Sequence, residues 1–244
     1  LFAEGCVLDV LQGYELQHAV AKLRFQRGER LIGYKVGCTS AAIQAQLKIS
    51  HRVRGFLFDT EQYESGVALA RQSFDNLAIE GELAIELSRE PRDEDFTDHL
   101  LPPCISRIFP VIELHNHVMR GQQASAGELI ANNAIHAGFI SEKGGLTLSH
   151  CSETMFDGAR LEIFVNNQLL GQCEGQFLLE TIRLSLKWLW HELLQNGERL
   201  HAGQIVLTGS VPSLFPVTDE CCIRVESVPF GGVAAKVKNS TLRT

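Results

Sequence analysis

The chain has 244 residues, of which 45% are hydrophobic and 21% are charged, and its net charge is −7. This composition is typical of a globular protein with one large domain or two small ones. The acidic net charge argues against nucleic-acid binding, which requires a basic protein face. We predict no membrane span, because the sequence contains no run of about 18 apolar residues. Seven cysteines without a C-x-x-C pair favour a reducing compartment, so we expect the protein in the cytoplasm.

The first part of the chain is predicted to alternate helices with short strands. A helix is expected over residues 5–27, and a glycine-bounded strand over 31–36. Ser40 is a suitable N-cap for a helix over 41–48. A strand over 54–58 and a turn over 60–66 complete this part.

Two long strands are predicted next, over 77–87 and 107–115. The first has the period of two that marks a strand in its apolar residues Ile79, Leu83, Ile85 and Leu87. The acidic, proline-bearing segment 88–103 lies between the two strands. We interpret it as a solvated surface excursion.

The C-terminal half is predicted to be rich in strands around one large helix. A hairpin over 159–175 turns at Asn166-Asn167, and strands are expected over 203–210, 221–228 and 232–238. The helix covers 177–194 and ends at Asn196-Gly197. Its apolar side consists of Leu178, Leu179, Ile182, Leu186, Leu189, Trp190, Leu193 and Leu194. These elements predict an α+β fold, and no obvious linker divides the chain.

Three carboxylates stand out in the long strands. Glu80 and Glu82 share one strand face with their Cα atoms roughly 7 Å apart, close enough to repel each other. Glu113 lies in the second apolar strand, where a charge is unexpected. Together they would form an oxygen-only site that suits Mg²⁺ or Mn²⁺. The alternative is a solvated strand face. Glu86 has the same phase but lies roughly 20 Å from Glu80, too far to share one ion.

His115 and His117 share the strand face of Glu113. A His-x-His pair with a nearby Glu could bind a transition metal, as in cupins. The cupin pattern places its Glu after the histidines, however, and that order is absent here. We therefore interpret both histidines as surface residues at a strand end.

Lys35 is the other unexpected charge in an apolar strand. It shares a face with Gly33 and Gly37, which leave open space above the sheet. A lysine in that space could meet an anionic ligand, or its side chain could extend along the surface to water. The pattern leaves both interpretations open.

Five segments, in one order, resemble the fumarylacetoacetate hydrolase superfamily. They are IGYKVGCTS, GFLFD, IEGELAIEL, VIELHNH and IVLTGS. The nearest resemblance is to its branch of 2-oxopent-4-enoate (2-hydroxypentadienoate) hydratases and 4-oxalocrotonate decarboxylases. It extends from about Val10, where GYELQ is similar to the branch's Tyr-x-x-Gln helix, to the C-terminus.

The resemblance implies a mixed β-sheet roll with a smaller helical N-terminal part. It implies an N-terminal α/β part, residues 1–60, that contributes Lys35, and a β-roll catalytic part, residues 61–244, with the metal site. The implied roles are metal ligands for Glu80, Glu82 and Glu113, an active-site lysine for Lys35, and substrate contacts for Asp59, Thr208, Gly209 and Ser210. The implied cofactor is Mg²⁺ or Mn²⁺.

The chain also departs from the pattern of this branch. Asn132-Asn133 stands where Asp-Asn is usual, and His117-Val118 stands where Ser-Arg often follows the third ligand. Glu180-Thr181-Ile182 replaces a Gly-x-Pro, and Asp59 comes one residue early. These changes leave the substrate open, and they leave open whether the activity is altered or lost.

The resemblance implies a hydratase of the 2-hydroxypentadienoate type that acts on small unsaturated 2-oxo or 2-hydroxy acids. The alternatives are a 4-oxalocrotonate-type decarboxylase, then an acylpyruvate hydrolase, then a non-catalytic binding protein with the same fold. Hydrolases of this superfamily add a His-Glu pair on a lid, and we find no convincing pair. We expect a homo-oligomer with no nucleic-acid or membrane partner.

Overall fold

The computed structural model describes residues 7–96, 101–118, 124–210 and 213–239. The helices are α1 (Val10–Gln26), α2 (Ala41–Leu47), α3 (Ala126–Ala131) and α4 (Gln176–Gln195). The strands are β1 (Leu31–Gly37), β2 (Val53–Phe58), β3 (Gln62–Glu64), β4 (Val67–Ala70), β5 (Leu77–Leu87), β6 (Ile105–Asn116), β7 (His136–Ser141), β8 (Leu146–Thr147), β9 (Arg160–Val165), β10 (Gln168–Glu174), β11 (Ile205–Leu207), β12 (Phe215–Pro216), β13 (Cys221–Val228) and β14 (Gly231–Lys238). Short 3₁₀ turns are η2 (Asp59–Glu61), η3 (Arg71–Ser73), η4 (Asp93–Phe96), η5 (Asn133–Ile135), η6 (Leu148–His150) and η7 (Glu153–Gly158).

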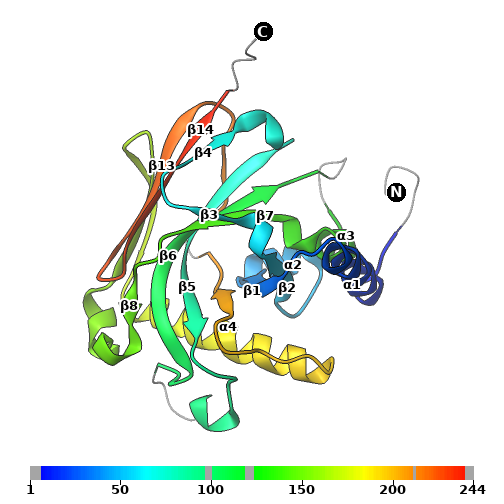
Figure 1. The fold of residues 1–244 in the computed structure, drawn as a ribbon, viewed down its shortest axis with the longest axis horizontal. Helices are drawn as coiled ribbons and strands as arrows, with labels where there is room; N and C mark the ends of the chain where they lie inside the picture. Colours follow the sequence, from blue (N-terminus) through cyan, green and yellow to red (C-terminus); the bar gives the residue numbers. More distant parts are fainter. Residues whose placement is uncertain (1–6, 97–100, 119–123, 211–212, 240–244) are drawn as a thin grey trace.

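Two β-sheets form the body of the protein (Figure 1). The larger sheet has the order β2-β1-β11-β5-β6-β7-β3, with β12 paired to β5 and β8 paired to β6. The smaller sheet has the order β10-β9-β13-β14-β4. Most neighbouring strands are antiparallel, but β1 pairs in parallel with β11, β3 with β7, and β4 with β14. The predicted mixed sheet and α+β class are therefore confirmed.

The two sheets approach each other closely at β5, which explains the glycine between its two glutamates. A Cβ atom added to Gly81 would lie 2.5 Å from Ile163 Cγ1 and 3.0 Å from Val225 Cγ2 of the smaller sheet. Because successive strand residues point to opposite faces, Glu80 and Glu82 point away from that contact. Gly81 thus permits tight packing on one face while its neighbours present carboxylates on the other.

Helix α4 packs against β5, β10 and η7. Its buried apolar residues are Leu178, Leu179, Ile182, Leu186, Leu189, Trp190 and Leu193. Trp190 stacks on Phe96 with ring centroids 5.4 Å apart. Leu194 was expected on the same apolar side, but that expectation is wrong, since Leu194 lies in the last helical turn and is exposed.

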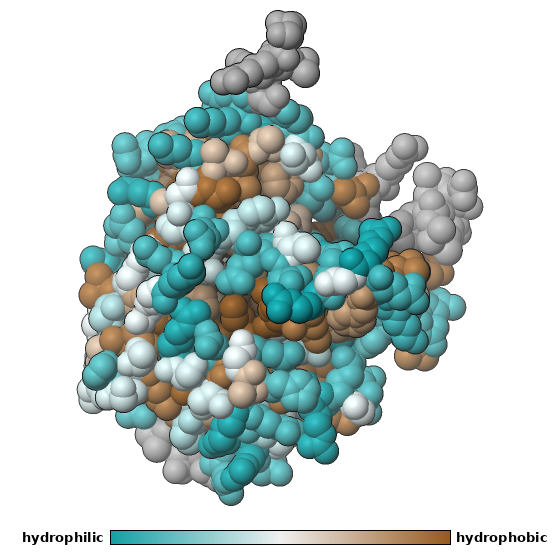
Figure 2. Space-filling view, in the orientation of Figure 1, coloured by the Kyte–Doolittle hydropathy of each residue, from teal (hydrophilic) through white to brown (hydrophobic). Residues whose placement is uncertain are grey.

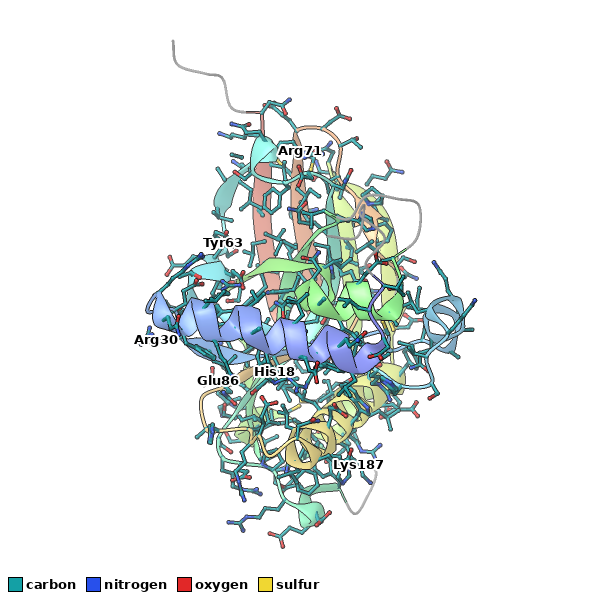
Figure 3. The ribbon with its side chains drawn as sticks, turned by 90° about the vertical axis from the view of Figure 1, so that its right-hand side faces the viewer. His18, Arg30, Tyr63, Arg71, Glu86 and Lys187 are labelled. Atoms are coloured by element: carbon teal, nitrogen blue, oxygen red, sulfur yellow. The ribbon has the colours of Figure 1, made fainter. Side chains whose placement is uncertain are left out.

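Helices α1 and α3 lie side by side at one end of the larger sheet (Figures 1 and 3). Their backbones meet where a Cβ atom on Gly13 would lie 2.6 Å from Gly127 O. The buried Gln17 amide donates to Arg54 O at 3.0 Å and to Ile130 O at 2.9 Å. These bonds fix α1 to β2 and α3, because a buried amide left unpaired would be costly.

Several predicted boundaries differ from the structure. The first helix begins at Val10 rather than residue 5, with Asp9 as its N-cap; residues 5 and 6 lie outside the described residues. The expected turn over 60–66 contains β3, which pairs with β7. The segment 88–103 is not simply solvated, because its residues Asp95 and Phe96 are buried; residues 97–100 lie outside the described part.

Strands β1 and β2 belong to the larger sheet, where β1 also pairs with β11. The division of the chain near residue 60 stays a prediction. Hydrophilic residues cover much of the face drawn in Figure 2, with small hydrophobic areas among them. Within the described residues, no helix has the length and hydropathy that crossing a membrane requires.

Candidate metal centre

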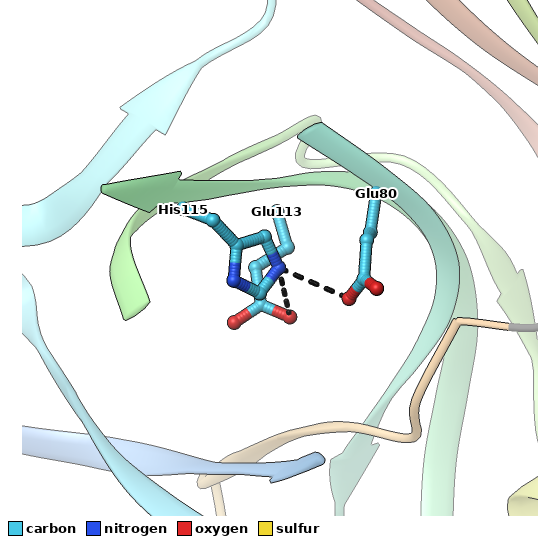
Figure 4. A group of neighbouring side chains, drawn as sticks. All are labelled: Glu80, Glu113 and His115. Carbon is cyan, nitrogen blue, oxygen red and sulfur yellow. Dashed lines mark hydrogen bonds and ion pairs between the residues drawn. The ribbon is translucent and has the colours of Figure 1, made fainter. Parts of the chain in front are cut away.

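The pairing of β5 with β6 gathers the acidic residues of the site. In this antiparallel register Glu80 stands directly opposite Glu113, so both side chains lie on one face of the sheet. His115 follows on β6 and lies beside both carboxylates (Figure 4). Glu82 and Glu113 are buried, and the Glu80 side chain is 20% exposed. Two neighbouring strands thus place carboxylates side by side in a largely buried region.

Nitrogen atoms surround the Glu113 carboxylate. His136 Nδ1 lies 2.6 Å from Glu113 Oε1, and Lys35 Nζ lies 3.4 Å from the same oxygen. His115 Nε2 lies 3.4 Å from Glu113 Oε2 and 3.0 Å from Glu80 Oε2. Glu113 is therefore contacted from β1, β6 and β7, which fixes its orientation.

Glycines give Lys35 its place on β1. A Cβ atom on Gly55, the residue paired with Lys35, would lie 3.1 Å from Lys35 Cγ. A Cβ atom on Gly37 would lie 3.1 Å from Lys35 Nζ. The Lys35 side chain is 4% exposed, so it does not extend to water, and that interpretation of the sequence is wrong.

The charges of the site shift the pKa values of its members. Burial and the charges of Glu113 and Glu80 raise the pKa of Glu82 well above its usual range. Burial would raise the pKa of Glu113 as well, but Lys35 and the two histidines hold it well below its ordinary value. Burial opposes the charge on Lys35, yet the carboxylates raise its pKa. The same balance raises the pKa of His115 to about 9.

The donor atoms fit a divalent cation. Glu82 Oε1 and Glu113 Oε2 are buried without a hydrogen-bond partner among the described residues, and buried acceptors are normally satisfied. Glu80, Glu113 and His115 each offer one ligand atom, and these atoms lie within 4.8 Å of one another. A hard divalent ion would satisfy such oxygens.

A cavity of about 640 Å³ adjoins this group. Lys35, Glu80, His115 and His117 line it. Aliphatic residues also line it, among them Ile43, Leu47, Leu129, Ile135 and Leu214. The cavity has room for a small organic acid with its polar end at the carboxylates.

No family model matches the chain, but curated relatives match most of it. A 2-keto-4-pentenoate hydratase of Paraburkholderia phymatum is 27% identical over 209 residues, covering 86% of this chain and 79% of that protein. A 2-hydroxyhexa-2,4-dienoate hydratase of Comamonas testosteroni is 25% identical, with the same coverage of 86% and 79%. A 4-oxalocrotonate decarboxylase of a Pseudomonas species is 25% identical, covering 93% and 86%.

Solved structures share the fold. The 4-oxalocrotonate decarboxylase of Pseudomonas putida G7, complexed with magnesium and adipate, matches with a TM-score of 0.81 and 22% identity over 94% of this chain and 86% of that one. Fumarylpyruvate hydrolase of Pseudomonas aeruginosa, with Mn²⁺ and pyruvate, gives 0.55 and 11% over 85% and 89%. Fumarylacetoacetate hydrolase of Exiguobacterium antarcticum gives 0.56 and 16% over 87% and 76%.

The chain has the fold of the fumarylacetoacetate hydrolase family. The resemblance to that superfamily and to its hydratase and decarboxylase branch is thereby confirmed. The ions in these neighbouring structures are Mg²⁺ and Mn²⁺, both of the class that the carboxylates of this chain fit.

The Thr-Gly-Ser turn after β11 contacts the site through its middle residue. Gly209 N donates to Glu82 Oε2 at 2.9 Å. Gly209 and Ser210 line the cavity, whereas Thr208 is buried and its hydroxyl donates to Leu83 O at 2.6 Å. The structure thus brings two residues of the turn to the cavity and uses Thr208 to hold the turn against β5.

Asp59 lies apart from this group. It begins η2, four residues beyond Gly55, and its carboxylate accepts hydrogen bonds from Arg30 N and Nε, both at 2.9 Å. Arg30 is labelled beyond the end of α1 in Figure 3. The structure does not bring Asp59 to the cavity, because its side chain joins the start of β1 to the end of β2.

One departure from the branch's pattern, Asn132-Asn133, adjoins two residues that line the cavity. Asn133 Oδ1 accepts from Phe56 N at 2.7 Å, and its Nδ2 donates to Phe56 O at 2.9 Å. Asn133, Ala134 and Ile135 have φ values of 53°, 52° and 57°, a left-handed run that is unusual for side chains of this kind. Asn133 holds this run against β2, and Ala134 and Ile135 line the cavity.

Two histidines were misjudged or missed. His115 was interpreted as a surface residue, but it is only 3% exposed because β6 continues to Asn116 within the sheet. His136 carried no recognisable signal, since it reaches Glu113 only through the left-handed run and the start of β7. The position of His115 two residues after Glu113 was the one available signal.

Proposed function

We propose that the protein is a metal-dependent hydro-lyase of the 2-keto-4-pentenoate hydratase type. It adds water to the carbon–carbon double bond of a small unsaturated 2-oxo or 2-hydroxy acid. The observation that carries this proposal is the pairing of Glu80 with the buried Glu113, which lies beside Lys35, at a cavity that Lys35 and Glu80 line. The hydratases among its relatives support the same reaction.

Glu80, Glu82 and Glu113 would hold Mg²⁺ or Mn²⁺. The bound ion supplies Lewis acidity, which stabilises negative charge that develops on a 2-oxo oxygen. Gly209 N holds one oxygen of Glu82, and His136 holds one oxygen of Glu113. These contacts orient the carboxylates before substrate arrives, which is the arrangement that efficient catalysis needs.

Lys35 binds the substrate carboxylate or moves a proton to and from the reacting carbon. Its ammonium group is buried beside Glu113 and lines the cavity. A charge-assisted contact in such a place is strong and directional. How the acid lies in the cavity decides which of these two roles Lys35 has.

The aliphatic residues of the cavity favour a short uncharged tail on the substrate. Among the described residues that line the cavity, Lys35 is the one lysine or arginine. A second carboxylate on the substrate would find no second lysine or arginine among these described residues, and an unpaired buried charge is costly. This favours a pentenoate- or hexadienoate-like acid over a diacid.

A 4-oxalocrotonate-type decarboxylase is the second candidate. A decarboxylase is among the relatives at 25% identity, and loss of CO₂ from a 2-oxo diacid would use the same stabilised enolate. An acylpyruvate hydrolase and a binding protein without activity rank lower.

The deciding experiment follows ultraviolet absorbance with a panel of 2-hydroxydienoates and 2-oxo diacids. We expect loss of dienoate absorbance with Mg²⁺ or Mn²⁺, no turnover after EDTA treatment, and recovery when metal is restored. Release of CO₂ from a diacid, without hydration of any dienoate, would replace the hydratase with the decarboxylase. Ligand binding without turnover of any compound would favour the binding protein.

We also propose a cytoplasmic homo-oligomer. Helix α1 exposes apolar side chains, with Leu11 69% and Leu23 55% exposed, and such residues are common at subunit contacts. Light scattering should give a mass that is a multiple of 27.0 kDa. A strictly monomeric mass over the micromolar range would reject the oligomer.

A further inference from the structure

His115 is placed as a metal-binding residue would be, although the resemblance implies carboxylates alone. Its Nε2 atom lies 3.0 Å from Glu80 Oε2 and 3.4 Å from Glu113 Oε2. The ligand atoms of all three side chains lie within 4.8 Å of one another. The ring is 3% exposed, so it is not a surface histidine that happens to face the site.

These separations match neighbouring corners of one coordination shell. Ligands at about 2.1 Å from an ion lie about 3.0 Å apart when adjacent and about 4.2 Å apart when opposite. The two contacts of His115 Nε2 fall near the adjacent value. One ion can therefore touch Glu80, Glu113 and His115 with small side-chain adjustments.

The two oxygens of Glu113 have different surroundings. Oε1 faces His136 Nδ1 and Lys35 Nζ, whereas Oε2 has no hydrogen-bond partner among the described residues and faces His115. The Oε2 side is therefore where an ion would bind, and His115 Nε2 borders that same space.

We propose that His115 Nε2 is a direct ligand of the divalent ion, beside Glu80 and Glu113. This rests on the metal dependence in the proposed function and adds one nitrogen to its carboxylate set. Imidazole favours first-row transition ions, whereas Mg²⁺ prefers oxygen donors. The site then selects Mn²⁺, Fe²⁺ or Co²⁺ over Mg²⁺ more strongly than carboxylates alone would.

Calorimetry on the metal-stripped full chain tests the selectivity. We compare Mg²⁺ and Co²⁺ binding to the wild type, His115→Leu and the control His117→Gln, whose ring has no described contact with the carboxylates. His115→Leu should lower Co²⁺ affinity at least tenfold more than Mg²⁺ affinity, while His117→Gln should leave the ratio of affinities unchanged. An equal loss for both ions in His115→Leu overturns the proposal.

A second measurement uses only the wild-type protein, so it does not depend on whether a variant folds. Pulsed electron paramagnetic resonance of the Mn²⁺-loaded wild type, grown with ¹⁵N-labelled histidine, should show the nitrogen coupling of a directly bound imidazole. Absence of that coupling overturns the proposal even when the protein is an active hydratase. If the nitrogen coupling is present but the protein hydrates no dienoate, His115 is still a metal ligand and the proposed function is rejected instead.

Discussion

Two buried carboxylates, Asp95 in η4 and Glu113 in β6, have opposite kinds of surroundings. Both oxygens of Asp95 are used within the fold. Oδ1 accepts from Arg89 Nη2 at 2.6 Å, and Oδ2 accepts from Arg89 Nη1 at 2.7 Å and from Arg92 N at 2.8 Å. Glu113 instead leaves Oε2 without a hydrogen-bond partner among the described residues.

The difference separates structural from functional charge. Burial would raise the pKa of Asp95, but the Arg89 guanidinium and the Arg92 N–H lower it, so partners within the fold outweigh burial. Around Glu113, three carboxylates meet Lys35 and His115, and Glu82 Oε1 and Glu113 Oε2 still have no hydrogen-bond partner among the described residues. Asp95 has both oxygens paired within the fold, whereas Glu113 leaves Oε2 available for the ion that we propose it binds.

We expect the largest effect from changing Glu113, whose Oε2 has no hydrogen-bond partner among the described residues. Glu113→Gln keeps the shape of the side chain but removes a negative charge from the site. We expect metal affinity and kcat/KM each to fall about a thousandfold or more, since metal binding supplies several kcal/mol to the transition state. Calorimetry and steady-state kinetics measure the two losses. Unchanged metal affinity in both Glu113→Gln and Glu82→Gln would show that the ion binds elsewhere.

Lys35→Met should have the next largest effect. Methionine has a similar length, so packing changes little, but one charge-assisted contact of about 2–5 kcal/mol is lost, or roughly 30- to several-thousand-fold in rate. We compare kcat/KM at saturating Mg²⁺, with the melting temperature as the folding control. A folded variant within about threefold of the wild type would make Lys35 structural.

The sequence predicted the elements of the site better than their arrangement. The period of two in β5 and the glycines around Lys35 are local patterns, so they could be recognised directly. That Glu80 stands opposite Glu113 depends on the register between one strand that ends at Leu87 and another that begins at Ile105, which no local pattern sets.

Other features of the site depend on tertiary structure, which no local pattern in the sequence reveals. His115 was assigned to the surface because its strand was expected to end there, whereas β6 continues and is covered. Asp59 was assigned to the substrate through the resemblance, but its carboxylate pairs with Arg30. His136 depends on three consecutive left-handed residues before β7, a conformation that the sequence IANNAIH does not reveal.

Asp95→Asn should lower the stability of the fold without changing metal affinity, in contrast to Glu113→Gln. It weakens hydrogen bonds to Arg89 and should lower the free energy of unfolding by about 1–3 kcal/mol, or the melting temperature by roughly 2–10 °C. Metal affinity should stay as in the wild type. Thermal melts and calorimetry check both, with the exposed Glu94→Gln as a matched control. A metal affinity that falls with Asp95→Asn would contradict the assignment of Asp95 as structural.

The smallest expected effect concerns His18 on α1, in a third group of charges that also belongs to the fold. His18 Nε2 lies 3.0 Å from Glu198 Oε1, which also accepts from Arg54 Nη2 at 2.8 Å. The hydrogen bond with Glu198 raises the pKa of His18, although burial opposes the shift. Protonated His18 therefore stabilises the fold fully below about pH 6.5, its unfolded pKa.

This stabilisation is lost as the pH rises through the higher folded pKa of His18. We expect the wild-type melting temperature to fall between pH 6 and pH 8 by about 1–2 °C more than that of His18→Gln, a small difference because the side chain is partly exposed and screened. Other titrating groups contribute equally to both proteins, so the difference isolates His18. Metal affinity should be the same in the two proteins at each pH. Parallel melting curves over this range would show that the Glu198 contact favours neither protonation state of His18.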